Sequence, residues 1–199
     1  MSSTNRSNAR EEHVADYYVT PVKDIEKFLI EFSKETPNLR WIGENILDPC
    51  AGGDAKHDMS YPKAIYNTYY TDSNIVTFDI RQDSLATIIC DYLKTDVHDI
   101  LGKNPQIIIT NPPFNQALPI IQKALQDVED GGYVIMLLRL NFLETKTRKE
   151  FFDNYMPQYI FVHHQRMSFI EGKGTDSVAY AHYVWQKGNY PDFARVKVI

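Results

Sequence analysis

The sequence predicts an α/β fold of the doubly wound type, with a mostly parallel, twisted sheet of about seven strands and helices on both faces. Two observations support this prediction. Short apolar runs of strand length alternate along the chain with segments whose apolar residues recur at helical spacing. One run, QIIIT at 106–110, holds three consecutive isoleucines, as is typical of a central parallel strand covered on both faces.

The first half of the chain supplies one helix and four strands. The helix is expected over 22–33, whose apolar side chains share one face: Ile25, Phe28, Leu29 and Phe32. The strands are short, apolar and mostly bounded by acidic or turn residues. They are expected at 45–47, 74–78, 86–90 and 106–110.

The second half continues the alternation. We expect helices at 118–126 and 146–154 and strands at 133–140, 159–164 and 179–186. The chain has 199 residues, of which 43% are hydrophobic, enough to bury one substantial core. Residues 1–14 are polar and are expected to form a disordered tail. Residues 15–199 are then a single domain.

Composition narrows the class of protein. The net charge of −5 argues against a protein that coats nucleic acid by bulk electrostatics. No apolar run approaches the ~20 residues of a membrane span, so we expect a soluble protein of the cytoplasm. The net charge does not exclude a local basic face that contacts nucleic acid, although a solvated helix surface would explain the same residues. Its members are Lys146, Arg148, Lys149, Arg166 and Lys173.

The tetrapeptide Asn111-Pro112-Pro113-Phe114, directly after QIIIT, is the strongest chemical signal. One reaction that these residue types suit is methylation of an aromatic amine. The exocyclic amine of adenine, for example, is a poor nucleophile because its lone pair is delocalised into the ring. An Asn oxygen and a backbone carbonyl held by consecutive prolines can accept both amine protons and favour a pyramidal nitrogen. The aromatic side chain can stack on a base turned out of its duplex. A plain proline turn after a strand would give the same four residues.

The second signal is the segment from Asp48 to Asp54 (DPCAGGD), which follows the strand at 45–47. Its small residues let the backbone approach a ligand closely, and its leading carboxylate suits a cation. Asp79, at the end of the next strand, can accept hydrogen bonds from ribose hydroxyls. Asp91-Tyr92 could contact an adenine ring. Each acid could equally be a turn former or a helix cap.

The order of these motifs resembles the amino-type (N6-adenine) DNA methyltransferases, above all the compact ones of phages and prophages. The resemblance begins at YYVTP, continues through LLRLNFLE at 137–144 and GKGTDS at 172–177, and covers roughly residues 17–187. It implies a Rossmann-like methyltransferase fold, S-adenosylmethionine as cofactor, S-adenosylhomocysteine as product and no metal. The implied catalytic residues are Asn111, Pro112, Pro113 and Phe114. The implied cofactor-binding residues are Tyr17, Thr20, Pro21, Asp48, Pro49, Cys50, Ala51, Gly52, Asp79, Ile80, Asp91, Tyr92 and Asn111.

The chain departs from that family in two ways. Asp54 stands where many members have a third glycine, and nothing resembles a large separate target-recognition domain. DNA is the expected partner, with base specificity supplied by short loops, by the GKGTD segment at 172–176, by a second copy of the chain or by a separate specificity subunit. Two alternatives stay open: a methyltransferase acting on RNA bases or a protein glutamine, and a non-catalytic cofactor-binding or anti-restriction subunit.

Overall fold

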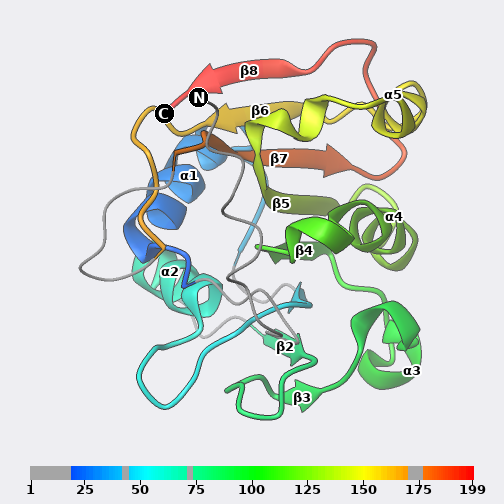
Figure 1. The fold of residues 1–199 in the computed structure, drawn as a ribbon. Helices are drawn as coiled ribbons and strands as arrows, with labels where there is room; N and C mark the ends of the chain where they lie inside the picture. Colours follow the sequence, from blue (N-terminus) through cyan, green and yellow to red (C-terminus); the bar gives the residue numbers. More distant parts are fainter. Residues whose placement is uncertain (1–18, 42–44, 71–73, 170–176) are drawn as a thin grey trace, which may run out of the picture.

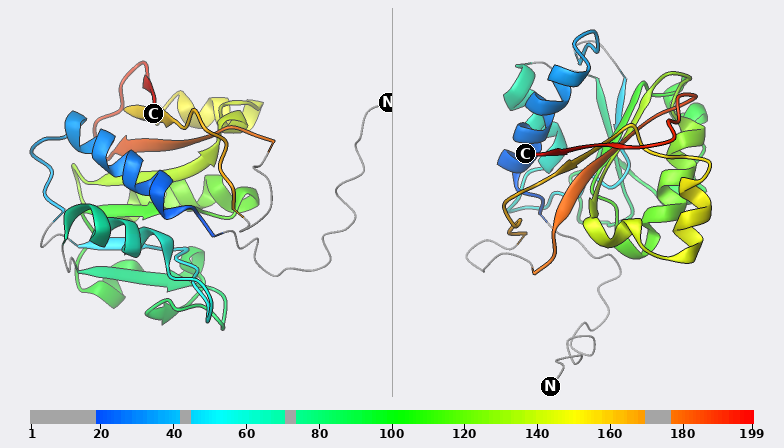
Figure 2. Two further views of the ribbon diagram at one scale, coloured as in Figure 1. Left: turned by 90° about the vertical axis from the view of Figure 1, so that its left-hand side faces the viewer. Right: turned by 90° about the horizontal axis from the view of Figure 1, so that it is seen from above.

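The computed structural model describes residues 19–41, 45–70, 74–169 and 177–199. These residues form an α/β fold in which one eight-stranded sheet lies between two layers of helices (Figure 1, Figure 2). The strands are β1 (Ile46–Asp48), β2 (Ile75–Asp79), β3 (Ile88–Ile89), β4 (Ile107–Thr110), β5 (Tyr133–Arg139), β6 (Tyr159–Val162), β7 (Tyr180–Gln186) and β8 (Arg195–Val198). The helices are α1 (Val22–Glu35), α2 (Ser60–Tyr69), α3 (Val97–Leu101), α4 (Ala117–Asp127) and α5 (Lys146–Phe152). The short 3-10 helices are η1 (Tyr92–Lys94), η2 (Phe114–Gln116) and η3 (Leu140–Leu143).

The strand order is β3-β2-β1-β4-β5-β7-β6-β8. All neighbouring strands are parallel except β7, which runs antiparallel to β5 and β6. The chain moves outward from β1 to β2 and β3 and then returns to β4 on the other side of β1. This reversal between β1 and β4 is the place where open α/β sheets bind ligands, beyond the carboxyl ends of the strands.

Two apolar cores cover the two faces of the sheet, and alternate residues of each strand feed them. Ile107 and Ile109 belong to the core under α1 and α2, whereas Ile108 belongs to the core under α4 and α5. Figure 2 shows α1 and α2 on one side of the sheet and α4 and α5 on the other. A strand buried on both faces has no polar face, which explains the run of isoleucines in β4.

A buried chain of hydrogen bonds joins α2 to the far half of the sheet. The His182 ring in β7 bonds to the Tyr61 hydroxyl at 3.1 Å and to His163 at 2.8 Å, and it stacks on Phe28 with ring centroids 4.0 Å apart. Burial lowers the pKa of His163 to about 4 and that of His182 well below its usual range. Both rings are therefore neutral at pH 7, and His163 points inward while its neighbour His164 is exposed.

The fold predicted from the sequence is confirmed, with differences in detail. The described residues hold eight strands rather than about seven, because 195–198 adds β8 beside β6. The predicted strand at 86–90 shrinks to two residues, and the predicted helix at 22–33 extends to Glu35. The helices α2 and α3 were not predicted. Residues 1–14, which are expected to form a disordered tail, lie outside the described residues.

Within the described ranges, no helix is both long and apolar enough to cross a membrane.

Candidate functional site

Three polar residues meet at the carboxyl edge of the sheet, on adjacent strands. Asp48 ends β1, Asp79 ends β2, and Asn111 follows β4. The register places β1 between the other two strands, with Leu47 opposite both Val76 and Ile108. The parallel pairing therefore brings together residues that are far apart in the sequence.

The loop after β1 is held by backbone hydrogen bonds to β2. The Gly52 N–H donates to the Asp79 carboxylate at 2.8 Å, and the Ala51 N–H donates to the Phe78 carbonyl at 2.9 Å. Gly52 and Gly53 have φ angles of 65° and 75°, which favour glycine. A Cβ on Gly53 would lie 2.9 Å from the Met59 side chain, so glycine also meets a steric need there.

Asp54 closes the end of this loop. Its carboxylate accepts hydrogen bonds from the N–H groups of Lys56 and His57 at 2.7 and 2.9 Å, and it contacts the His57 ring at 2.9 Å. Where related proteins would use a third glycine, this chain has a turn former. These hydrogen bonds to the charged form hold the pKa of Asp54 below its usual range.

Asp48 is fully buried, and its environment penalises the charged form. Burial raises its pKa to about 7, while the nearby Thr110 hydroxyl and the Cys50 N–H act in the opposite direction. One carboxylate oxygen accepts from Cys50 N at 3.2 Å. The other oxygen makes no hydrogen bond of good geometry among the described residues, although the Thr110 hydroxyl lies near enough to favour the charged form of the carboxyl group.

Asn111 shows the same feature on the neighbouring strand. Its side-chain Nδ2 donates to the Thr20 hydroxyl at 3.0 Å, a contact across 91 positions of sequence. Its Oδ1 is buried and has no hydrogen-bond partner within the described ranges. Thr20 is itself only 3% exposed, just before α1. The Thr-Pro motif and the Asn-Pro-Pro-Phe motif are thus parts of one site, in which Thr20 orients the Asn111 amide.

Phe114 forms one wall next to this amide. The Arg139 guanidinium lies over its ring, with Cζ 4.6 Å from the ring centroid. The Tyr180 ring lies 5.7 Å away, and Arg139 Nε donates to the Tyr180 hydroxyl at 3.4 Å. Phe114 is only partly buried. Arg139 and Tyr180 thus both pack against the Phe114 ring.

The residues expected near the cofactor adenine differ in their exposure and in their contacts. Ile80 follows Asp79 and is 51% exposed, so its apolar side chain is free to cover a ring. Tyr92, in contrast, is only 4% exposed and packs in the core, with Lys123 Nζ 5.1 Å from its ring centroid. The Asp91 carboxylate caps η1 and pairs with Lys94 at 2.9 Å. The contact of Asp91 and Tyr92 with the cofactor adenine stays a prediction.

The predicted basic face is described only in part. Lys146 and Lys149 are exposed on α5, where Lys149 pairs with Asp153, and Arg166 is exposed beyond β6. Arg148 instead turns inward: its Nη1 donates to the Asn141 carbonyl at 3.2 Å. Phosphate contact by these residues stays a prediction. Tyr17 and Lys173, the remaining predicted site residues, lie outside the described residues.

Sequence reasoning missed the contribution of β5 to this edge. It assigned no role to Arg139, Asn141 or Glu144, although all three lie in the segment LLRLNFLE. Their position directly after a predicted central strand was the available signal, because that is where the other site residues lie. The contact of Arg139 with Phe114 could not be read from the sequence.

The comparisons with known proteins agree with this fold. The model resembles a Listeria monocytogenes protein described as a class I S-adenosylmethionine-dependent methyltransferase (TM-score 0.66, 12% identity, 91% of this chain and 65% of the other covered). It also resembles the methyltransferase subunit of a type I restriction-modification system from Streptococcus thermophilus (0.63, 11%, 86% and 45%). A third similar structure, from Pyrococcus horikoshii, is described as an RNA methyltransferase (0.60, 13%, 89% and 91%).

These neighbours establish the fold: the chain has the Rossmann-like fold of class I methyltransferases. It spans about two thirds of the Listeria protein and less than half of the restriction-modification subunit. No protein-family model matches the sequence, and a search of curated proteins finds no match. The chemistry therefore has to be argued from the residues of the site.

Proposed function

We propose that this chain transfers the methyl group of S-adenosylmethionine to the N6 amine of adenine in DNA. The observation that carries the proposal is the Asn111 amide at the carboxyl end of β4. Thr20 holds its nitrogen, its oxygen is buried and unpartnered among the described residues, and two prolines and a partly buried phenyl ring follow. This is an acceptor fixed in advance for an amine, beside a surface on which a planar base can stack.

The residues at the ends of β1 and β2 fit the cofactor that this fold takes. Each Asp79 oxygen already accepts one backbone N–H, from Gly52 or Arg81, and each keeps a lone pair for a ribose hydroxyl. Ile80 offers an apolar cover for the adenine ring, and Asp48 in its ionised form offers a negative charge to a cationic group of the cofactor. When bound, S-adenosylmethionine supplies a methyl group activated by its sulfonium, and S-adenosylhomocysteine remains afterwards.

The chain's own residues then act on the amine. Asn111 Oδ1 accepts a hydrogen bond from one amine proton, and a carbonyl of the proline pair accepts from the other. These bonds favour the pyramidal nitrogen, whose lone pair is free to attack, and they strengthen as the nitrogen becomes more acidic during attack. The methylated nitrogen then releases one proton to solvent and becomes neutral. Phe114 holds the base by stacking, with the Arg139 guanidinium packed against its ring. Neither role requires a covalent enzyme intermediate, so Cys50 needs no catalytic function.

We propose DNA as the substrate, and not RNA or protein, because the resemblance to DNA methyltransferases extends beyond the catalytic tetrapeptide into LLRLNFLE. Similarity to a subunit of a type I restriction-modification system supports this choice, and the RNA methyltransferase neighbour is the reason to test the alternative. Target selection would then involve loops at this edge, a second copy of the chain or a separate specificity subunit.

The test is a methyl-transfer assay with tritiated cofactor and three acceptors: duplex DNA, total RNA and protein from the same cells. We expect label in DNA, recovered as N6-methyladenine after digestion to nucleosides. Label in RNA or protein alone would overturn the proposed substrate. Cofactor binding measured by calorimetry, without transfer to any of the three acceptors, would favour the non-catalytic subunit.

A further inference from the structure

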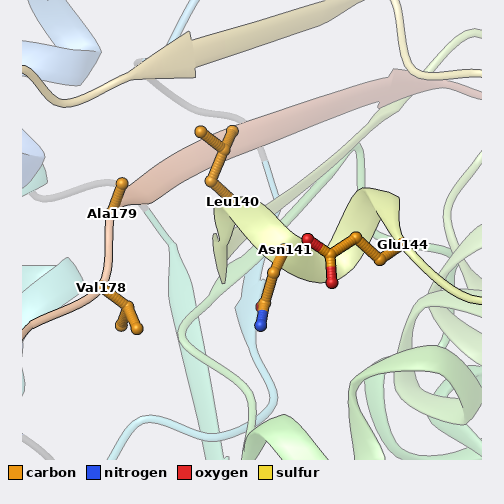
Figure 3. Close-up of a pocket in the computed structure, with 5 residues that line it drawn as sticks. All are labelled: Leu140, Asn141, Glu144, Val178 and Ala179. Atoms are coloured by element: carbon orange, nitrogen blue, oxygen red, sulfur yellow. The ribbon is translucent and has the colours of Figure 1, made fainter.

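A pocket of about 280 Å³ opens beside the candidate site, where β5 passes into η3. Leu140, Val178 and Ala179 form its apolar walls, and Asn141 and Glu144 line it with polar side chains (Figure 3). The figure shows the Asn141 amide and the Glu144 carboxylate next to each other on one side, with Val178 and Ala179 across from them. None of these five residues has a role in the proposed methyl transfer.

The backbone that carries the two polar side chains is held firmly. Arg148 donates to the Asn141 carbonyl at 3.2 Å and stacks on Phe142, with Cζ 4.5 Å from the ring centroid. Phe142 is only 4% exposed and packs against Phe152 and Tyr183. The Asn141 amide and the Glu144 carboxylate, in contrast, have no hydrogen-bond partner in the described part of the chain. The turn is fixed while its polar groups are free for a ligand.

The chemistry of the pocket selects among ligands. A carboxylate without a neighbouring cation in the pocket repels phosphate, so the pocket does not suit a nucleic-acid backbone. Its apolar walls suit a flat ring, and its volume is large enough for one nucleobase. Glu144 can accept from an exocyclic amine, and Asn141 can donate and accept at the same edge of the base. Thymine lacks such an amine.

The pocket is also continuous with the wall that we assign to the target base. Arg139, which lies over Phe114, directly precedes Leu140. Val178 packs against the same small apolar cluster as Phe114, built on Leu137, Phe169 and Tyr180. A nucleotide in this pocket would therefore be close in space to a base stacked on Phe114.

We propose that this pocket reads a base that flanks the target adenine, and that Glu144 and Asn141 select a base bearing an exocyclic amine over thymine. The proposal rests on the proposed function, because it concerns the sequence in which that reaction occurs. Under this proposal, part of the sequence specificity lies in the methyltransferase fold itself.

The test uses the full chain and a library of duplexes with random sequence around a central adenine. Methylated products are identified by sequencing. We expect the parent protein to disfavour thymine about tenfold or more at one flanking position, and Glu144→Gln to reduce this to about threefold or less, since one good base contact is worth ~1–3 kcal/mol. Glu150→Gln, the same charge change on an exposed residue of α5, is the matched control and should keep the parent preference.

Each outcome decides one point. A flanking preference that is the same in the parent protein and in Glu144→Gln overturns the pocket assignment, even if adenine is methylated. If no duplex is methylated, the proposed function fails, and the anisotropy of labelled oligonucleotides then tests the pocket alone. In that binding assay, weaker discrimination against thymine in Glu144→Gln supports base reading. Equal binding of all flanking bases by both proteins overturns it.

Discussion

Two regions of this molecule bury polar side chains, and they do so in opposite ways. At the carboxyl edge of β1, β2 and β4, the buried oxygens of Asp48 Oδ2 and Asn111 Oδ1 lack partners among the described residues. On the α1 and α2 face, Tyr61, His182 and His163 form a closed chain of hydrogen bonds. A satisfied polar chain stabilises and specifies the packing, whereas a buried oxygen without a partner is costly unless another group supplies the hydrogen bond. Under the proposed function, a ligand supplies it at the carboxyl edge, and the two regions would then serve different purposes.

The largest effect is expected from Asn111→Ala. If the amide oxygen accepts from the target amine, its contribution arises mainly in the transition state, so the single-turnover rate of methyl transfer should fall at least ~10²-fold. Cofactor and DNA affinities should change little. The measurement is a rapid-quench assay with saturating cofactor and DNA. A variant that methylates at the parent rate would reduce the Asn-Pro-Pro-Phe motif to a turn.

The next effect is expected from Asp79→Ala. Its carboxylate supports the Gly52 N–H and is assigned to the ribose hydroxyls, so its removal should weaken cofactor binding roughly tenfold or more, as for a lost charged hydrogen bond. Calorimetry measures this directly. Asp96→Ala is the matched control, because the Asp96 side chain caps α3 and is not among the predicted cofactor-binding residues, and its variant should bind within about threefold of the parent. Equal losses in both variants would contradict our placement of the cofactor.

The third prediction tests the structural side of the comparison. His182→Phe keeps the stacking on Phe28 but leaves the Tyr61 hydroxyl and His163 without this partner. The free energy of unfolding should fall by about 1–3 kcal/mol, the cost of an unsatisfied buried group. Cofactor affinity at a temperature where both proteins are folded should be unchanged. A loss of affinity without a loss of stability would mean that the histidine chain serves the site.

The smallest effect concerns pH and Asp48. Because burial raises the pKa of Asp48 to about 7, the folded protein keeps a proton that the unfolded chain releases above its usual pKa of 3.8. Stability therefore falls as pH rises from about 4 to about 7, by roughly 1 kcal/mol between about pH 6 and 7.5. The substitution Asp48→Asn should abolish the part of this decrease in stability that Asp48 causes. His163, whose lowered pKa acts in the opposite direction, is present in both proteins and cancels in the difference.

Urea unfolding of the parent and of Asp48→Asn at several pH values measures that difference. The stability gained by the substitution should grow with pH. A gain that is the same at about pH 6 and pH 7.5 would show that Asp48 is not protonated in the folded protein near neutrality.

The sequence predicted the fold well where hydrophobic periodicity is strong. The strands β4, β5 and β7 and the helices α1, α4 and α5 lie within about two residues of their predicted ends, because each buries a regular apolar pattern. The helix α2 was missed because its buried residues, Ser60, Tyr61, Ala64 and Ile65, include two with polar groups. The strand β8 was missed because its two valines, Val196 and Val198, are exposed rather than buried.

The sequence predicted that the candidate residues would lie together, but not their contacts. Strand-end position predicted that Asp48, Asp79 and Asn111 would share one edge, since parallel strands bring their carboxyl ends together, and they do. Which residues orient them depends on packing between distant segments, as in the hydrogen bond from Asn111 to Thr20. The burial of Tyr92 was not predicted either, because it depends on the helix α4 that packs against η1. The functional roles of these residues stay predictions.

Because all the groups assigned to binding and chemistry lie at the carboxyl edge, the opposite edge of the sheet is open to engineering. The turn at Gly102, between α3 and β4, lies at that opposite edge, and a Cβ there would meet no atom within 4 Å. A fluorescent protein or a programmable DNA-binding module inserted after Lys103 would extend away from the reacting groups. The fold thus offers a built-in attachment point for a sensor or a targeted editor.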